Sequence, residues 1–157
     1  RDEMQYLLDN NIREKGEYQL TNALEAMKQK GYRFSPGRVD EWLDCGNKDA
    51  TVYTNQRVLE LKKDAEQLVA GDVVLRNSVI VEPCYIGSGV VLENAVVGPH
   101  VSIGKNSTVK NALIRNSIIQ ESVTISDKLI ANSMIGSHAI VQGTPDDLSV
   151  SDYSTMA

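Results

Sequence analysis

The side chains best suited to chemistry fall in two short segments and at two single positions. The segments are Glu17-Tyr18-Gln19-Leu20-Thr21 and Trp42-Leu43-Asp44-Cys45-Gly46, and the single residues are His100 and His138. A carboxylate accepts strong hydrogen bonds and ligates hard cations. A histidine, whose pKa lies near neutral, can act as a general base. Purely structural explanations compete, because Glu17 would also suit the start of a helix and Asp44 would also suit a turn.

The elements that must position these residues are dominated by a repeat between Val73 and Val141. Aliphatic residues recur in it every five or six positions, at Val74, Ile80, Ile86, Leu92, Val97, Ile103, Val109, Ile114, Ile119, Ile125, Ile130, Ile135 and Val141. Four of them are followed by glycine, and Asn-Ser pairs that suit tight corners stand between others. A period of six fits neither a helix nor a simple strand alternation and indicates a β-helix repeat.

This pattern resembles the hexapeptide-repeat family, which implies a left-handed parallel β-helix with triangular coils. The span from Val73 to Val141 would supply roughly four coils. We therefore expect a mainly β protein in which the β-helix follows a small α+β segment. The alternative is an antiparallel β-sandwich, which has no reason to keep a six-residue period.

The α+β segment, residues 1–68, is predicted to hold two or three helices and a small hairpin. Apolar residues at helical spacing predict a first helix through Met4, Leu7, Leu8 and Ile12, a second from Tyr18 or Gln19 to Gly31, and a third from about Asp49 to Asp64 that buries Val52, Leu59 and Leu61. Strands at Tyr32–Phe34 and Val39–Leu43 would meet at a Pro36-Gly37 turn. Such a segment is too small to form a large core alone and needs a partner.

The two chemical segments also resemble a known family. Glu17 to Thr21 is similar to the Glu-x-Gln-Leu-Thr-Asp motif of sugar-phosphate nucleotidyltransferases, and Trp42 to Gly46 is similar to their Trp-x-Asp-x-Gly motif. Their order and spacing, the following helix and the β-helix also match. Asn22 stands where the family usually has Asp, Asn47-Lys48 stands where it often has Thr-Pro, and the family's N-terminal Gly-rich nucleotide loop is absent.

The resemblance implies nucleotidyl transfer, in which a sugar 1-phosphate attacks a nucleoside triphosphate, with dTDP-glucose as the expected product. It implies that Asp44 ligates Mg²⁺ together with a second Asp outside this chain, that Glu17 accepts hydrogen bonds from the sugar and that Trp42 packs beside it. The chain would then be the C-terminal part of a longer enzyme, inactive alone and binding no cofactor by itself.

Two other functions are open. Many hexapeptide-repeat proteins are acyltransferases that use acetyl-CoA and a histidine base, so His100 and His138 are candidates, although a solvated or hydrogen-bonded coil residue is the favoured explanation of each. Such enzymes commonly carry an extended loop, and the repeat between Ile80 and Val141 has none. The β-helix could instead be an assembly module, and we expect a homo-oligomer such as a trimer.

The composition of the chain argues against several other classes of protein function. The 157-residue chain has a net charge of −5 and no basic run, which argues against nucleic-acid or anionic-membrane partners. Cys45 and Cys84 make no disulfide framework, and neither lies in a metal-binding cluster, so we expect reduced, buried thiols and a cytoplasmic protein. The expected domains are residues 1–68, the β-helix at 69–145 and a polar tail at 146–157.

Overall fold

The computed structural model describes residues 1–144 and 146–155. They form two compact units, Arg1–Trp42 and Leu43–Ala157, and each unit is considered by itself. Residues 145, 156 and 157, which the expected β-helix and tail include, lie outside the described residues. None of the helices found in the described part of the chain has the length and apolar character needed to span a membrane.

The first unit is a pair of short helices, α1 (Asp2–Asp9) and α2 (Leu20–Gln29). Leu7 and Ala23 are its buried apolar residues, and Lys30 Nζ lies 2.6 Å from Glu3 Oε1. Both helices match the apolar spacing in the sequence, and Gly31 at φ +85° ends the second as expected. Half of the first stripe stays exposed, namely Leu8 and Ile12, whereas Met4 is partly buried.

The predicted hairpin at residues 32–43 is wrong. This segment contains no strand, and although Leu43 is partly buried, its other large apolar side chains, Tyr32, Phe34, Val39 and Trp42, are more than half exposed. An isolated pair of short strands is at best marginally stable in water without a further strand or an apolar surface to cover it. Local turn residues alone therefore do not produce a hairpin here.

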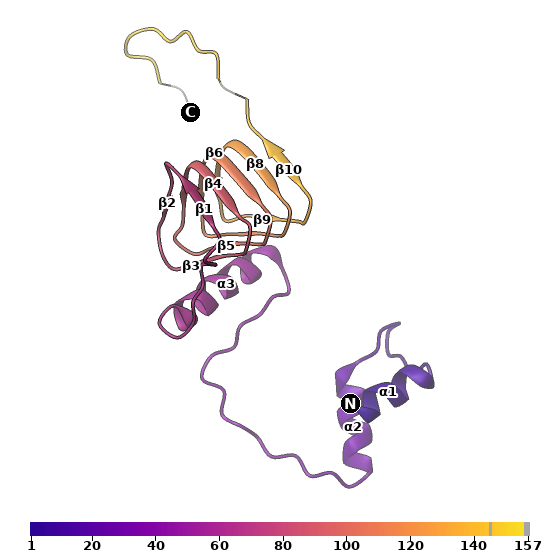
Figure 1. The fold of residues 1–157 in the computed structure, drawn as a ribbon. Coiled ribbons are helices and arrows are strands. Elements are labelled where there is room, and N and C mark those ends of the chain that lie inside the picture. Colours follow the sequence, from indigo (N-terminus) through magenta and orange to yellow (C-terminus); the bar gives the residue numbers. More distant parts are fainter. Residues whose placement is uncertain (145, 156–157) are drawn as a thin grey trace. The chain divides into compact units, whose positions relative to one another are not determined.

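The second unit is a parallel β-helix of about four coils, which confirms the predicted fold class (Figure 1). Its strands are β1 (Val74–Arg76), β2 (Val79–Ile80), β3 (Cys84–Ile86), β4 (Val91–Val97), β5 (Val101–Ile103), β6 (Thr108–Arg115), β7 (Ser117–Ile119), β8 (Thr124–Ala131), β9 (Met134–Ile135) and β10 (Ile140–Gln142). One hydrogen-bonded path runs β1-β4-β6-β8-β10, with β2 also on β4, and the other runs β3-β5-β7-β9. Every ladder in these paths is parallel. The left-handed winding stays a prediction.

The repeating aliphatic residues stack in three columns inside the coils. Parallel register joins Ile86, Ile103, Ile119 and Ile135 in one column, Leu92, Val109, Ile125 and Val141 in a second, and Ile80, Val97, Ile114 and Ile130 in a third. Nine of these twelve side chains are at most 8% exposed, and Ile80, Ile135 and Val141 at the end coils are partly buried. Val74 does not belong to the columns, because Leu75 is the residue in register with Leu92, and Val74 is 40% exposed.

The corners are formed by residues with a left-handed backbone. At the corner inside β4, β6 and β8 these are Asn94, Asn111 and Asp127, and Asn77 occupies the same corner one coil earlier. Their side chains form a ladder along the axis, with Asn77 Nδ2 2.8 Å from Asn94 Oδ1 and Asn111 Nδ2 2.9 Å from Asp127 Oδ1. Asparagine tolerates this conformation better than most residues, which explains its recurrence.

Helix α3 (Lys48–Lys62) packs on the sheet formed by β3, β5, β7 and β9 (Figure 1). Asn47 caps its start by accepting a hydrogen bond from the Ala50 backbone N–H at 2.9 Å. Val52 and Leu59 are buried as predicted, whereas Leu61 is 62% exposed and was wrongly assigned to the core. The compact units therefore separate α3 from α1 and α2 and join it to the β-helix.

Candidate functional site

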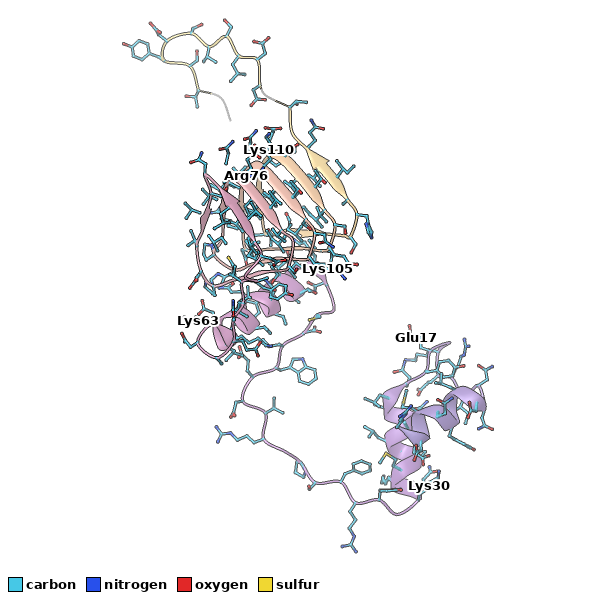
Figure 2. All side chains as sticks on the ribbon, in the orientation of Figure 1. Glu17, Lys30, Lys63, Arg76, Lys105 and Lys110 are labelled. Atoms are coloured by element: carbon cyan, nitrogen blue, oxygen red, sulfur yellow. The ribbon has the colours of Figure 1, made fainter. Side chains whose placement is uncertain are left out.

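Glu17 lies in a tight turn of the first unit, directly before α2. The turn is closed by two backbone hydrogen bonds, Glu14 N–H to Glu17 O at 2.9 Å and Glu17 N–H to Glu14 O at 3.0 Å. Lys15 and Gly16 between them both have positive φ, which is the geometry of a two-residue hairpin turn. The Glu17 side chain is exposed and accepts a hydrogen bond from Gln19 Nε2 at 3.3 Å (Figure 2). Its carboxylate is therefore free to accept further hydrogen bonds from a ligand.

Trp42 ends the first unit and carries an open aromatic surface. Its side chain is 82% exposed, far more than a tryptophan usually is in a folded protein. An exposed indole offers a flat apolar surface with a polar N–H at its edge. The described part of the first unit leaves this surface uncovered.

Asp44 opens the second unit in the turn that leads into α3. Its Oδ1 accepts a hydrogen bond from the Gly46 backbone N–H at 3.1 Å, and its carbonyl oxygen accepts one from Thr54 Oγ1 at 2.6 Å. Thr51 Oγ1 also donates to the carbonyl oxygens of Cys45 and Asn47. The helix thus holds the motif in place, and the exposed Asp44 carboxylate keeps one oxygen without a hydrogen bond within the described structure.

These contacts test whether the chain could hold the Mg²⁺ ion that the resemblance implies. Magnesium is bound by one or two protein carboxylates together with water and substrate phosphates. Asp44 offers one suitable exposed carboxylate, and no cluster of three or more metal-ligating side chains occurs among residues 1–144 and 146–155. The residues fit a metal site only as one part of it. Glu17 and Trp42 lie in the first unit and Asp44 in the second.

His100 has a structural role that its sequence position did not reveal. It occupies a left-handed corner, and its Nε2 lies 2.7 Å from Glu60 Oε1 on α3. Lys63 Nζ lies 2.9 Å from the other oxygen of Glu60. The hydrogen bond from His100, and then the one from Lys63, lower the pKa of Glu60 to about 2. The imidazole therefore holds α3 against the β-helix.

Asn55 completes this contact between the helix and the coils. Its Oδ1 accepts a hydrogen bond from Ser102 Oγ at 2.6 Å, and its Nδ2 lies 3.4 Å from the carbonyl oxygen of His100. Sequence reasoning missed Asn55 and Glu60 because it expected a partner for this segment, with the β-helix as one possibility, but did not assign the polar contacts of α3. The signal that could have found them is their spacing, since positions 55 and 60 fall near the same helix face as the buried Val52 and Leu59.

His138 lies at a different corner from His100. It has φ +62° and follows Gly89, Asn106 and Ser122 in a series of left-handed corner residues. Its backbone N–H donates to Glu121 O at 3.0 Å, and its side chain is exposed. The coils repeat every 16 or 17 residues on both sides, as the Asn ladders show, so no loop projects beside either histidine. The role of His100 and His138 as acyl-transfer bases stays a prediction, and the fold does not support it.

The fold and the motif residues together define a class of protein. It is a parallel β-helix protein in which short motifs before the β-helix carry two exposed carboxylates and an exposed indole. No family model matches the chain. The chain is 27% identical over 147 residues to a glucose-1-phosphate thymidylyltransferase of Streptomyces griseus and 28% identical over 137 residues to one of Streptomyces antibioticus. It is also 30% identical over 151 residues to the low-salt glycan biosynthesis nucleotidyltransferase Agl11 of Haloferax volcanii.

These relatives confirm the resemblance to sugar nucleotidyltransferases that the two motifs indicated. The three similarities cover 84%, 78% and 85% of this chain but only 41%, 38% and 42% of the relatives. The chain thus spans about two fifths of the length of the curated relatives it matches.

Proposed function

We propose that this chain is part of a sugar-1-phosphate nucleotidyltransferase that makes a nucleotide sugar, most specifically dTDP-glucose. In this reaction an oxygen of the sugar 1-phosphate attacks the α-phosphorus of the nucleoside triphosphate. The bond from the α-phosphorus to the bridging oxygen breaks, and pyrophosphate leaves. The observation that carries the proposal is the similarity to three proteins named as nucleotidyltransferases, which covers 84%, 78% and 85% of the chain.

Three residues are proposed to act on the sugar side of this reaction. Glu17 would accept hydrogen bonds from sugar hydroxyls, for which a carboxylate is a strong acceptor. Trp42 would cover the apolar face of the sugar ring. Asp44 would provide one carboxylate for Mg²⁺, which when bound neutralises negative charge on phosphoryl oxygens. All three side chains are exposed to solvent, so a ligand can reach them.

The β-helix is proposed to hold copies of the protein together. Its core is filled by its own aliphatic columns, so it has no internal space for a substrate. Its outer surface consists of flat parallel sheets, which are suitable for docking, and symmetric association is the usual outcome for such surfaces. We also place the protein in the cytoplasm, in keeping with its two free cysteines: Cys84 is buried as expected, whereas Cys45 is exposed, contrary to the expectation.

The proposal is tested in the gene product that contains this chain. Pyrophosphate release is followed with glucose 1-phosphate, dTTP and Mg²⁺ for the wild type and for Asp44→Asn, with Asp64→Asn as the control on an exposed carboxylate outside the motifs. Asp44→Asn is expected to lower kcat at least 100-fold, because loss of a metal ligand removes charge stabilisation in the transition state. Glu17→Gln is expected to raise KM for the sugar phosphate more than it lowers kcat, with Glu25→Gln as its control. Wild-type activity in Asp44→Asn would refute the assignment.

A further inference from the structure

Asp44 lies in an irregular part of the chain, which does not by itself hold a side chain in one place. Residues 43–47, called the Asp44 segment below, contain no helix or strand. A metal ligand has to be held close to a single geometry, because small displacements weaken its bond to the ion. Helix α3 begins directly after this segment, so it is the element that could supply the restraint.

Two threonines of α3 donate hydrogen bonds back to the Asp44 segment, and they do so in different ways. Thr51 Oγ1 donates to Asn47 O at 2.7 Å, four residues earlier, which is the ordinary bond of a threonine in a helix, and to Cys45 O at 3.2 Å. Thr54 Oγ1 instead donates to Asp44 O at 2.6 Å, ten residues earlier and outside the helix. The half-buried Thr54 hydroxyl therefore fixes Asp44 and contributes nothing to the hydrogen bonding of the helix itself.

Asp44 is thus held both at its backbone and at its side chain. Its carbonyl oxygen accepts the hydrogen bond from Thr54, and its Oδ1 accepts one from the Gly46 backbone N–H at 3.1 Å. The two bonds restrict the peptide group and the carboxylate together. The second carboxylate oxygen, Oδ2, has no hydrogen bond within the described structure, so the restrained group presents one open oxygen. This is the arrangement that a single carboxylate ligand of a magnesium ion requires.

Helix α3 is a firm support because it is fixed to the β-helix along its length (Figure 1). Polar contacts join it to the coils at its start, middle and end: Lys48 Nζ to Asn132 O at 3.0 Å, Ser102 Oγ to Asn55 Oδ1 at 2.6 Å, and Glu60 Oε1 to His100 Nε2 at 2.7 Å. The apolar face between them is closed, since Val52 and Leu59 are each 3% exposed. The helix that carries Thr54 therefore moves with the coils and not with the Asp44 segment.

We propose that Thr54 is a positioning residue for nucleotidyl transfer, because its hydroxyl fastens the Asp44 segment to α3 and so fixes the orientation in which the Asp44 carboxylate meets the metal ion. Thr54 acts only through Asp44, without contact to the ion or the substrate. The β-helix then has a part in the reaction besides assembly, since it is the body to which α3 is fixed. The inference rests on the metal role proposed above for Asp44.

The first experiment measures the restraint itself, as the hydrogen-exchange rate of the Gly46 amide in the 157-residue chain. Thr54→Val removes the hydroxyl but keeps the branched shape, and it should speed this exchange about tenfold, the effect of one lost hydrogen bond. Thr54→Ser keeps the hydroxyl and should keep the wild-type rate. Thr108→Val is the matched control, since Thr108 is exposed on β6. A Gly46 amide without protection in the wild type, or an unchanged rate in Thr54→Val, would overturn the proposal.

The second experiment measures metal binding in the gene product that contains this chain, from the electron paramagnetic resonance signal of free Mn²⁺. Thr54→Val should raise the Mn²⁺ dissociation constant about tenfold, and Thr54→Ser and Thr108→Val should leave it unchanged. In the Asp44→Asn background, Thr54→Val should cause no further loss, because the hydroxyl acts through the carboxylate. Circular dichroism checks that every variant stays folded. Losses that add in the double variant would overturn the positioning role.

The inference and the proposed function fail separately in these measurements. Wild-type Mn²⁺ binding and wild-type pyrophosphate release in Asp44→Asn would sink the metal role on which the proposed function depends. A loss of both in Asp44→Asn, with wild-type Mn²⁺ binding in Thr54→Val, would sink the positioning role of Thr54 alone.

Discussion

Gly104→Ala is the substitution that probes the stacking of the coils most sharply. Gly104 follows Ile103 at the end of β5, under the coil that contains Gln120 and Glu121. A Cβ atom built on Gly104 would lie 2.6 Å from Glu121 N and 2.7 Å from Gln120 C, both of them backbone atoms. The backbone of Gly104 does not have positive φ, so this close approach is the whole cost of adding a methyl group.

The expected loss in the free energy of unfolding follows from that geometry. The coil above would have to shift by several tenths of an ångström, and overpacking of this kind typically costs about 1–3 kcal/mol. Gly136 is the matched control, because it occupies the same position in the last coil, after Ile135, and a Cβ there would meet nothing within 4 Å. Gly136→Ala should change the free energy of unfolding by less than about 0.5 kcal/mol.

The assay is urea denaturation followed by circular dichroism. With an m value of about 2 kcal/mol/M in urea, a loss of about 1–3 kcal/mol lowers the midpoint by about 0.5–1.5 M. The control should keep the wild-type midpoint. Equal midpoints for Gly104→Ala and Gly136→Ala would refute the coil-on-coil packing described for these residues.

Three further predictions concern the core, the helix contact and the motif. Ile103→Ala should destabilise the protein by about 2–5 kcal/mol, because Ile103 is fully buried between Ile86 and Ile119, and denaturant midpoints would show whether it does. Because the pKa of Glu60 falls from 4.5 to about 2 on folding, its contribution to stability is complete above pH 4.5 and is lost as the pH falls toward 2. Glu60→Gln should therefore flatten the pH dependence of the unfolding midpoint in that window, and an unchanged slope would contradict the Glu60–His100 contact. The 157-residue chain alone should release no pyrophosphate from dTTP and glucose 1-phosphate, since Asp44 is the one residue of this chain that we propose as a metal ligand, and turnover by the isolated chain would show that this account of the site is incomplete.

The β-helix could be predicted from the sequence because the residues that fill its core recur at short, regular spacing along the chain. Each coil buries one aliphatic residue per side, so Ile86, Ile103 and Ile119 signal their positions through spacing alone. The first coil departs from this rule, since Val74 is placed one residue out of register. At the end of a solenoid there is no preceding coil to fix which aliphatic residue turns inward.

The contacts of α3 could not be predicted in the same way. The bonds of Glu60 with His100 and of Asn55 with Ser102 join residues 40 and 47 positions apart, and no local pattern encodes such a pairing. The hairpin failed for a related reason. Pro36-Gly37 supplies a turn, but strands need a surface that the described residues of the first unit do not offer them.

The candidate site could be predicted as motifs but not as an assembled centre. Glu17, Trp42 and Asp44 are exposed and available, as their proposed roles require. Each is held by local geometry: the turn at Lys15-Gly16 presents Glu17, and the capped start of α3 presents Asp44. Glu17 and Trp42 lie in one compact unit and Asp44 lies in the other, and neither motif encodes the joint role that we propose for them.

Product analysis by ³¹P NMR tests the central claim most directly. The gene product that contains this chain is incubated with glucose 1-phosphate, dTTP and Mg²⁺, and a parallel sample receives acetyl-CoA and an amino-sugar phosphate. The account predicts pyrophosphate and a nucleoside diphosphate sugar in the first sample and no free CoA in the second. Free CoA that depends on His100 or His138, with no pyrophosphate in the first sample, would contradict it.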